Sequence, residues 1–144
     1  MISRKTRYSL MALLRLAKEY GKGPVQISDI AQGQGIPQKF LESILNDCKK
    51  LGVVQSKMGK SGGYYLIKPP AEIDIASIYN HFEGPISMLS CASEKHYQSC
   101  EFCRDEEKCG IRKTFKRVRD LSYEILKNTT LQSLIDDDET TAYK

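Results

Sequence analysis

Four cysteines that lie within 19 residues of one another are the side chains of this 144-residue sequence best suited to chemistry. Thiolates this close together on a flexible loop can converge on one metal centre without large strain, whereas a reduced and unpaired set would be a redox liability. Soft sulfur ligands select iron–sulfur clusters, zinc or copper over magnesium or calcium. The four are Cys91, Cys100, Cys103 and Cys109, spaced C-x8-C-x2-C-x5-C, and we call residues 91–109 the cysteine loop.

The spacing leaves an iron–sulfur cluster (2Fe–2S or 4Fe–4S) and zinc open as cofactors, with redox disulfides or idle thiols as a third interpretation. Zinc ribbons usually contain two close cysteine pairs, and this loop contains one, Cys100 and Cys103. Iron–sulfur loops tolerate irregular spacing. We leave His96 and His81 out of the expected ligand set, because a solvated histidine is the more common role. The fifth cysteine, Cys48, falls at an apolar helix position and is predicted to be a buried structural thiol.

No other group of residues predicts catalysis, since no histidine is placed beside a serine nucleophile and no carboxylate pair forms a cleft motif. We therefore expect no enzymatic activity and no small-molecule substrate. No apolar run approaches the roughly 20 residues that span a bilayer, and the basic N-terminus lacks a small-residue cleavage site. An odd number of cysteines without an export signal predicts a cytoplasmic protein with reduced thiols and no membrane association.

The positive charge of the chain is confined to its first half. The formal net charge is +4, but residues 1–72 contain 12 Lys and Arg against 5 Asp and Glu, and residues 73–144 contain 10 against 13. This imbalance points to a polyanionic partner for the first half. Charge alone is weak support, because many solvated faces are rich in lysine.

The elements that must position these groups begin with three helices. Apolar residues at three- and four-residue spacing predict a helix over residues 4–20, and a short β-like link then leads to a second helix of about two turns. Ala31 and Gly35, followed by a third helix from Pro37, have the spacing of a helix-turn-helix. Ala31 is small where the helices cross, and Gly35 can adopt the left-handed conformation that the tight turn needs. An ordinary helical hairpin is the alternative.

Two short strands after the third helix predict a wing. The turn between them, residues 57–63, is basic and rich in glycine. A phosphate-binding glycine loop is excluded, because that motif runs from a strand to a helix and ends in Lys-Ser or Lys-Thr. In a winged helix the third helix enters the major groove and the wing contacts the backbone or the minor groove. The expected contacts with double-stranded DNA are Gln38, Lys39, Phe40, Glu42, Lys57, Lys60 and Tyr64.

A long amphipathic helix over residues 110–127 predicts a homodimer. It spans about five turns, and an apolar stripe of this length is usually buried against a partner. Packing on its own domain is the alternative. The stripe, which we call the apolar stripe, consists of Ile111, Phe115, Val118, Leu121 and Ile125.

The predicted elements divide the chain into four parts. Residues 1–70 form a winged helix-turn-helix domain, and residues 71–109 contain a linker helix at 75–82 and the cysteine loop. Residues 110–135 form the dimerisation helix and a C-terminal turn. The remaining residues, 136–144, form an acidic tail that we expect to be disordered.

Taken together, these residues resemble the IscR-, NsrR- and CymR-like family of bacterial winged-helix transcription regulators. The resemblance covers nearly the whole chain, from residue 2 to residue 134. It implies a mainly α fold with a small β-hairpin wing, and a homodimer joined through the long helix that binds palindromic operators. In many members, three loop cysteines hold an iron–sulfur cluster. The matching segments are Asp29–Ala31, Gly35–Ile36, Phe40–Glu42, Leu51–Gly52, Gly62–Leu66, the cysteine loop and Thr130–Leu131.

The sequence departs from the family at two places. The fourth ligand in the family is a histidine three residues after the last cysteine, or an acidic residue of the partner's first helix, and these positions hold Arg112 and Arg7. Neither can ligate a metal, so Cys100 is the natural replacement and gives an all-cysteine site within one subunit. An arginine that the family often places just before the first wing glycine is Met58 here, which leaves base preference at that position open.

The sequence therefore predicts a homodimeric DNA-binding transcription regulator, acting as a repressor, whose operator affinity is controlled by an iron–sulfur cluster. The cysteine loop joins the wing domain to the dimer helix, so a cluster that orders the loop can set the distance between the two recognition helices. The alternatives are a regulator switched by thiol oxidation, one that carries a structural zinc, and a protein-interaction module without DNA binding.

Overall fold

Helices form most of the chain, as a computed structural model shows for residues 1–138. The described residues form a mainly α fold with one two-stranded antiparallel hairpin, which confirms the predicted fold class. In chain order the elements are α1 (Arg4–Lys18), α2 (Ile27–Gln34), α3 (Gln38–Leu51), β1 (Val54–Lys57), β2 (Gly63–Leu66), η1 (Pro70–Glu72), α4 (Ile75–Glu83), η2 (Ser90–Ala92), α5 (Gly110–Asn128) and α6 (Leu131–Asp137).

Helices α2 and α3 form the predicted helix-turn-helix. Helix α2 ends at Gly35, whose φ of 64° lies in the left-handed region, where residues other than glycine are strained. Ile36 is buried in the turn, and Pro37 immediately precedes α3. The inner face of α3 is fully buried, which locks the two helices onto α1; it consists of Leu41, Ile44, Leu45 and Cys48.

The wing pairs with the body as well as with itself. Within the hairpin, Val54 lies opposite Leu66 and Lys57 lies opposite Gly63. The backbone of Val25, between α1 and α2, also exchanges two hydrogen bonds of 2.8 Å with Tyr64 of β2. Gly63 has a φ of 143°, and a Cβ atom at this position would collide with the Val25 carbonyl group. Only glycine therefore allows the wing to approach the body this closely.

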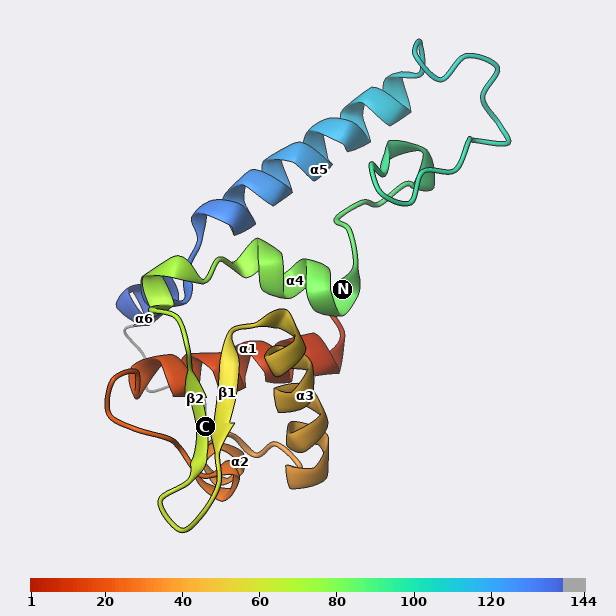
Figure 1. Ribbon diagram of the computed structural model, residues 1–144. Helices are drawn as coiled ribbons and strands as arrows, with labels where there is room; N and C mark the ends of the chain where they lie inside the picture. The colour runs from red at the N-terminus through yellow and green to blue at the C-terminus, as the bar shows by residue number, and fades with distance from the viewer. Residues whose placement is uncertain (139–144) are drawn as a thin grey trace.

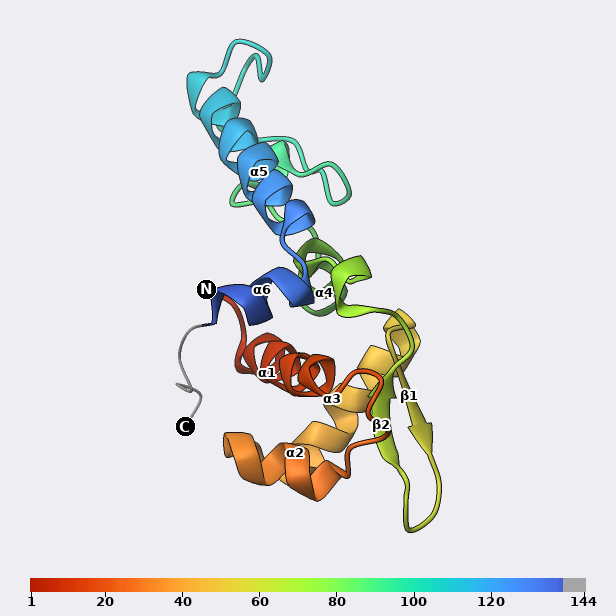
Figure 2. The same ribbon diagram turned by 90° about the vertical axis from the view of Figure 1, so that its left-hand side faces the viewer.

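Helix α1 is the centre of the winged-helix body and packs against α3, α4, α6 and β2. Its residues Ala12 and Leu13 are fully buried. Leu131, the first residue of α6, is fully buried in the same core. The C-terminal helix therefore folds back onto the body, and Figure 2 shows it lying above α1.

Helix α4 connects the body to α5. The backbone N–H of Leu131 donates to the Ile73 carbonyl at 3.0 Å, and the N–H of Ile75 donates to the Thr129 carbonyl at 2.9 Å. These bonds join the start of α4 to the junction between α5 and α6. From that junction α5 extends away from the body, with the cysteine loop at its far end (Figure 1). We call α5 and the cysteine loop the arm.

The C-terminal helix is longer than the sequence predicted. A capping box of Thr130 and Ser133 begins α6, and the Gln132 side chain donates to Asp136 at 2.9 Å in its last turn. The prediction that a disordered tail begins at residue 136 is therefore wrong for Asp136 and Asp137, which are helical. The last six residues of the predicted tail, 139–144, lie outside the described residues. None of the helices among residues 1–138 combines the length and the apolar character needed to cross a membrane.

Candidate functional site

Helix α3 presents a polar face to solvent beside the wing. Gln38, Lys39 and Glu42 are exposed on it. Ser43 and Asn46 are exposed further along the same face, because residues three, four and seven apart on a helix are neighbours. These two residues were not among the predicted contacts, although their helical spacing from Lys39 and Glu42 was the signal that could have identified them.

Phe40 does not belong to this polar face. Its side chain is half-buried and packs against the hydrophobic core. The rings of Phe40 and Tyr8 meet edge to face, with centroids 5.7 Å apart, a geometry that aromatic pairs favour. The structure thus shows Phe40 packing α3 onto α1, and its contact with DNA stays a prediction.

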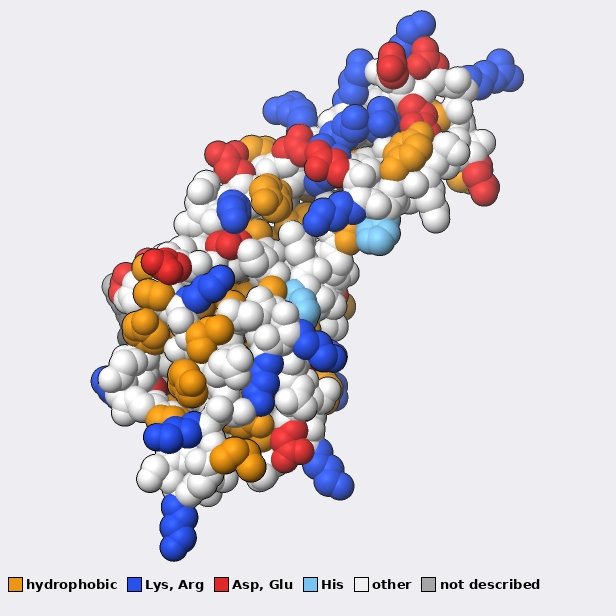
Figure 3. Space-filling model, in the orientation of Figure 1, with side chains coloured by type: hydrophobic (Ala, Val, Ile, Leu, Met, Phe, Trp, Pro, Cys, Tyr) orange, Lys and Arg blue, Asp and Glu red, His pale blue; other side chains and the backbone are white. Residues whose placement is uncertain are grey.

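The wing carries the basic side chains Lys57 and Lys60, both of which are exposed. The Gln26 side chain donates to the Lys60 carbonyl at 3.2 Å, which ties the turn of the wing to the residue before α2. A groove of about 480 Å³ lies between α2, α3 and the wing, and Gln26, Gln38 and Lys57 line it. Figure 3 shows Lys and Arg side chains at this end of the molecule. The helix-turn-helix and the wing therefore form the two sides of one groove that carries polar and basic side chains.

Tyr64 supports this surface from below. It is half-buried, and the Lys49 ammonium group lies 5.4 Å from its ring centroid, within the range of a cation–π contact. The same ammonium group donates to the Ser56 hydroxyl at 2.6 Å. Lys49 therefore bridges α3 and the wing, and Tyr64 holds that bridge in place.

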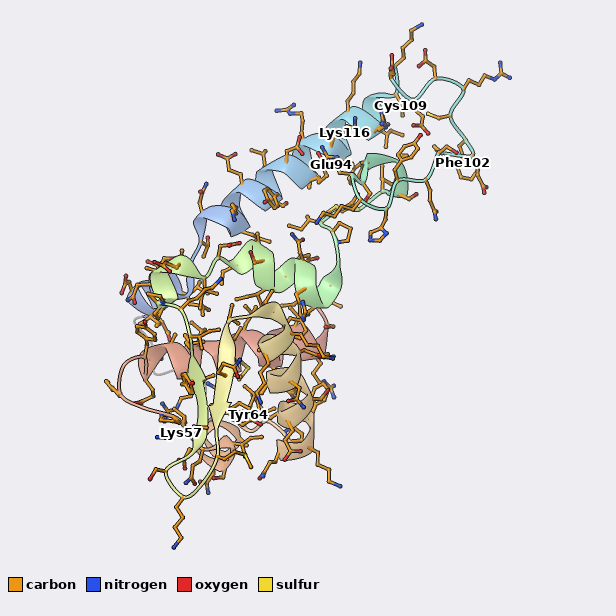
Figure 4. All side chains as sticks on the ribbon, viewed as in Figure 1. Lys57, Tyr64, Glu94, Phe102, Cys109 and Lys116 are labelled. Atoms are coloured by element: carbon orange, nitrogen blue, oxygen red, sulfur yellow. The ribbon has the colours of Figure 1, made fainter. Side chains whose placement is uncertain are left out.

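The cysteine loop lies at the opposite end of the molecule. Figure 4 shows Phe102 and Cys109 at the far end of the arm, whereas Lys57 and Tyr64 lie on the wing. All five cysteines of the chain are free thiols. Cys91, in η2, is buried, and the three other cysteines of the loop are partly exposed. Any influence of the loop on the surface formed by α3 and the wing must therefore pass through α4, α5 or a second subunit.

Three of the loop thiols already interact. Cys109 is the N-cap of α5, and its sulfur accepts a hydrogen bond from the Arg112 N–H at 3.5 Å. This bond, together with one from the Cys103 thiol, lowers the pKa of Cys109, because a helix N-terminus stabilises a thiolate. The bond to Cys109 raises the pKa of Cys103 to about 11, and Cys100 adds to that rise. Cys109 is therefore more acidic than an ordinary cysteine, and the thiolate is the form that ligates metals.

A carboxylate and a guanidinium group hold the backbone around these thiols. The Glu106 carboxylate accepts hydrogen bonds from the Tyr97 hydroxyl and the Cys100 N–H, both at 2.7 Å, and both bonds lower the pKa of Glu106. Arg112 Nε lies 3.7 Å from this carboxylate and donates to the Cys91 carbonyl at 2.8 Å. We call these two side chains the Glu106–Arg112 pair. From the sequence, Arg112 was interpreted only as a missing ligand, and Glu106 was not identified.

The donors of the loop are not assembled into a metal site. Within residues 1–138, no group of three or more His, Cys, Asp or Glu side chains is arranged to hold a metal ion. The chemistry of the donor set nevertheless fits a soft metal centre, since four sulfur atoms lie on one loop. Cys48 lies apart from them, and its complete burial raises the pKa of its thiol to about 12. This burial confirms the prediction of a structural cysteine.

The apolar stripe faces solvent along α5. This 19-residue helix has no buried residue. Ile111, Leu121 and Ile125 are 65%, 56% and 65% exposed, and Phe115 and Val118 are half-buried. The three most exposed members of the stripe therefore do not pack on their own domain. A contiguous exposed apolar face of this kind marks an interaction surface.

Comparisons with known proteins agree with this arrangement. The Rrf2 family, described as iron-dependent transcriptional regulators, matches residues 2–137. The chain is 41% identical over 138 residues to an rrf2-like HTH-type transcriptional regulator of Rhodobacter capsulatus, which covers 94% of this chain and 92% of that protein. It is 35% identical over 144 residues to the HTH-type transcriptional regulator CymR of Bacillus subtilis, which covers 99% of this chain and 96% of that protein.

Solved structures share the same fold. The structure of CymR, the global cysteine regulator of B. subtilis, has a TM-score of 0.80 and 32% identity, covering 96% of this chain and 98% of that chain. The structure of T. potens IscR has a TM-score of 0.73 and 28% identity, covering 96% and 88%. The helix-turn-helix, the wing and these similarities together show that the chain belongs to the Rrf2 family of winged-helix, DNA-binding transcriptional regulators, which are not enzymes.

Proposed function

We propose that this chain is a homodimeric repressor of palindromic operators whose DNA affinity is set by an iron–sulfur cluster on the cysteine loop. The observation that carries the proposal is the interacting group of Cys100, Cys103 and Cys109 at the N-terminus of α5. Cys91 is tied to the same helix through Arg112. These four residues would hold the cluster, which supplies redox-active iron and a crosslink that orders the loop.

The proposed DNA contacts follow from the exposed surface of α3 and the wing. Gln38, Lys39 and Glu42, with Ser43 and Asn46 added from the structure, present donors and acceptors suited to base edges in the major groove. The lysines of the wing are suited to phosphates. Tyr64 supports the wing from beneath.

The proposed dimer covers the apolar stripe with the stripe of a second copy. A two-fold symmetric interface uses the same surface patch on both subunits, and a helix with an exposed stripe can pair with its own copy. Such a dimer would place two recognition helices at a fixed separation, as two half-sites of an operator require.

The proposed coupling runs through α4. The cysteine loop follows α4 closely in the chain, and Glu83, the last residue of α4, binds the first turn of α1 through Ser3 and Thr6. A change in the order of the loop therefore reaches the body through a helix that is held at both ends. The description of the family as iron-dependent supports iron at this loop.

Metal analysis of anaerobically purified protein tests the proposal. We expect a brown protein that contains iron and acid-labile sulfide, and we expect Cys103→Ala to lose the colour. Cys48→Ala is the matched control and should retain the cluster, because Cys48 is buried far from the loop in the core of the body. A colourless protein with one zinc per chain would contradict the proposal.

A thiol switch is the second candidate, and the pairing of Cys103 with a Cys109 thiol of lowered pKa favours it. In that case a peroxide would oxidise the two thiols to one disulfide and would itself be reduced to water. Protein that binds no metal after anaerobic reconstitution, but forms this disulfide with peroxide, would select the thiol switch over the cluster.

A further inference from the structure

We infer that the Glu106–Arg112 pair positions the cluster ligands, by fixing the backbone of the cysteine loop near Cys91, Cys100 and Cys109 before a cluster binds. The inference rests on the proposed function, because positioning has a purpose only if the loop receives a cluster. Neither side chain of the pair contains sulfur. Their proposed role is to arrange the cysteines that bind the cluster.

Glu106 fixes the middle of the loop. Its two oxygens accept from the Cys100 N–H and the Tyr97 hydroxyl, both at 2.7 Å. The backbone of the same residue accepts from the Cys109 N–H at 3.3 Å. Hydrogen bonds to an ionised carboxylate are about twice as strong as neutral ones. One residue thus links the segments that carry Cys100 and Cys109.

Arg112 fixes the start of the loop. Its Nε donates to the Cys91 carbonyl in η2, while Glu106 lies 3.7 Å away on the other side. Each side chain of the pair is 18% exposed, so water screens their interaction less than on an open surface. Arg119, about two turns further along α5, donates to the next carbonyl, that of Ala92. Two arginines on one face of α5 therefore donate hydrogen bonds to the backbone of η2.

The loop has no regular secondary structure to hold its shape. Between Ala92 and Gly110 it contains no helix or strand, and the pair adds to a few local bonds such as that from the Gln98 N–H to the Ser90 carbonyl at 3.3 Å. Groups that orient metal ligands without touching the metal typically change metal affinity about 10- to 100-fold when they are replaced. The Glu106–Arg112 pair meets that description, because its side-chain bonds to Cys100 and Cys91 end on backbone groups and not on sulfur atoms.

Amide hydrogen exchange of the cluster-free protein tests the positioning directly. We expect Glu106→Ala to raise the exchange rate of the loop segment that contains Cys100 at least about tenfold, because that amide loses its acceptor. Glu107→Ala is the matched control, since Glu107 is the exposed neighbour of Glu106, and should leave the rate unchanged. Glu106→Gln keeps one acceptor oxygen and should give an intermediate rate.

Release of iron from the loaded protein to a chelator tests the consequence for the cluster. We expect Glu106→Ala and Arg112→Lys to release iron about 10- to 100-fold faster than the unmodified chain, with a changed visible circular dichroism spectrum. Lysine keeps the charge of Arg112 but lacks its planar fork of donors. Arg117→Lys, at an exposed position of α5, is the control. The unfolding midpoint of the body should not change, which separates positioning from general stability.

The outcomes separate this inference from the proposed function. Unchanged exchange and unchanged iron release in Glu106→Ala and Arg112→Lys would overturn the inference while leaving the cluster in place. Failure of the unmodified chain to take up a cluster would overturn the proposed function, and with it the role of the pair as a positioning element. Faster exchange and faster iron release together would support both.

Discussion

The Glu83 carboxylate, at the end of α4, accepts a hydrogen bond from the Ser3 backbone N–H at 2.6 Å, although the two residues are 80 positions apart in the chain. The Thr6 hydroxyl donates to the same oxygen. These bonds lower the pKa of Glu83, the bond from Thr6 contributing most. The residue nearest the cysteine loop on α4 is thereby joined to the first turn of the DNA-binding body.

Replacing Glu83 should weaken the coupling between the loop and DNA. We expect Glu83→Ala to reduce the difference in operator affinity between cluster-loaded and cluster-free protein by about fivefold or more, within the usual range of allosteric coupling. Fluorescence anisotropy with both forms measures this ratio. Glu72→Ala, at an exposed position of η1, is the control. Equal coupling in Glu83→Ala and the unmodified chain would show that the signal takes another route.

Charging the apolar stripe should separate the subunits. Leu121→Glu places a carboxylate in the proposed interface, where an unpaired buried charge costs several kcal/mol. Leu121 is 56% exposed in the single chain, so the fold of each subunit should survive. Val118→Glu, at the half-buried centre of the stripe, should act in the same direction. Sedimentation should then show monomers whose operator affinity is strongly reduced.

Tyr123→Glu is the matched control for the stripe. Tyr123 is 45% exposed on the same helix but lies beside a pocket formed with Asn80 and Glu94, outside the apolar stripe. This variant should remain dimeric. If Leu121→Glu were also dimeric at micromolar concentration, the stripe would not be the interface.

The lysines of the wing should contribute affinity without sequence preference. We expect Lys57→Ala and Lys60→Ala each to weaken binding to every duplex and to reduce the slope of log K against log salt by about one. Asn46→Ala should instead change base preference, because a well-placed side chain discriminates between bases by about 1–3 kcal/mol. Salt titrations on operator and scrambled duplexes measure both effects. Lys113→Ala, on the arm, should leave binding unchanged.

Acid should weaken the joint between α4 and α5 through Asp74. Burial raises the pKa of Asp74, but hydrogen bonds from Ser77 and Lys127 outweigh it, so the pKa is lowered overall. A lowered folded-state pKa stabilises the fold above the unfolded value of about 3.9, and that stabilisation is lost as the pH falls through the folded value. Asp74→Ala should also lose the N-cap of α4, at a cost of about 1 kcal/mol.

Urea unfolding at pH 7 and pH 3, at one protein concentration, measures this dependence. The loss of stability between the two pH values should be smaller in Asp74→Asn than in the unmodified chain, because the amide keeps an acceptor but carries no charge. Asp137→Asn, at an exposed position near the end of α6, is the control. If Asp74→Asn leaves the acid dependence of stability unchanged, that dependence arises from other carboxylates.

The helix-turn-helix and the wing were predictable because their signals are local. Gly35 ends α2 in the left-handed conformation that the spacing required, and the apolar face of α3 is buried as its periodicity predicted. The packing of Phe40 was not predicted, because periodicity does not show that Tyr8 lies on the facing helix. The same periodicity could have predicted the exposure of Asn46.

The contacts that join distant segments were not predictable from local patterns. Nothing in the sequence around Glu83 points to Ser3, and Glu106 and Arg112 belong to different segments, the cysteine loop and α5. The helical state of Asp136 depends on the packing of α6 against α1, which fixes a segment whose acidic composition alone favours disorder. In each case tertiary packing decides what the local sequence leaves open.

Operator affinity with and without the cluster is the most direct measurement of the central claim. One anaerobic preparation would be titrated against a promoter duplex at fixed salt, before and after a chelator removes the metal. We expect the two affinities to differ about tenfold or more, and we expect Cys91→Ala to bind as the cluster-free form does. Equal affinities of the loaded and the cluster-free protein would contradict control of DNA binding by the cysteine loop.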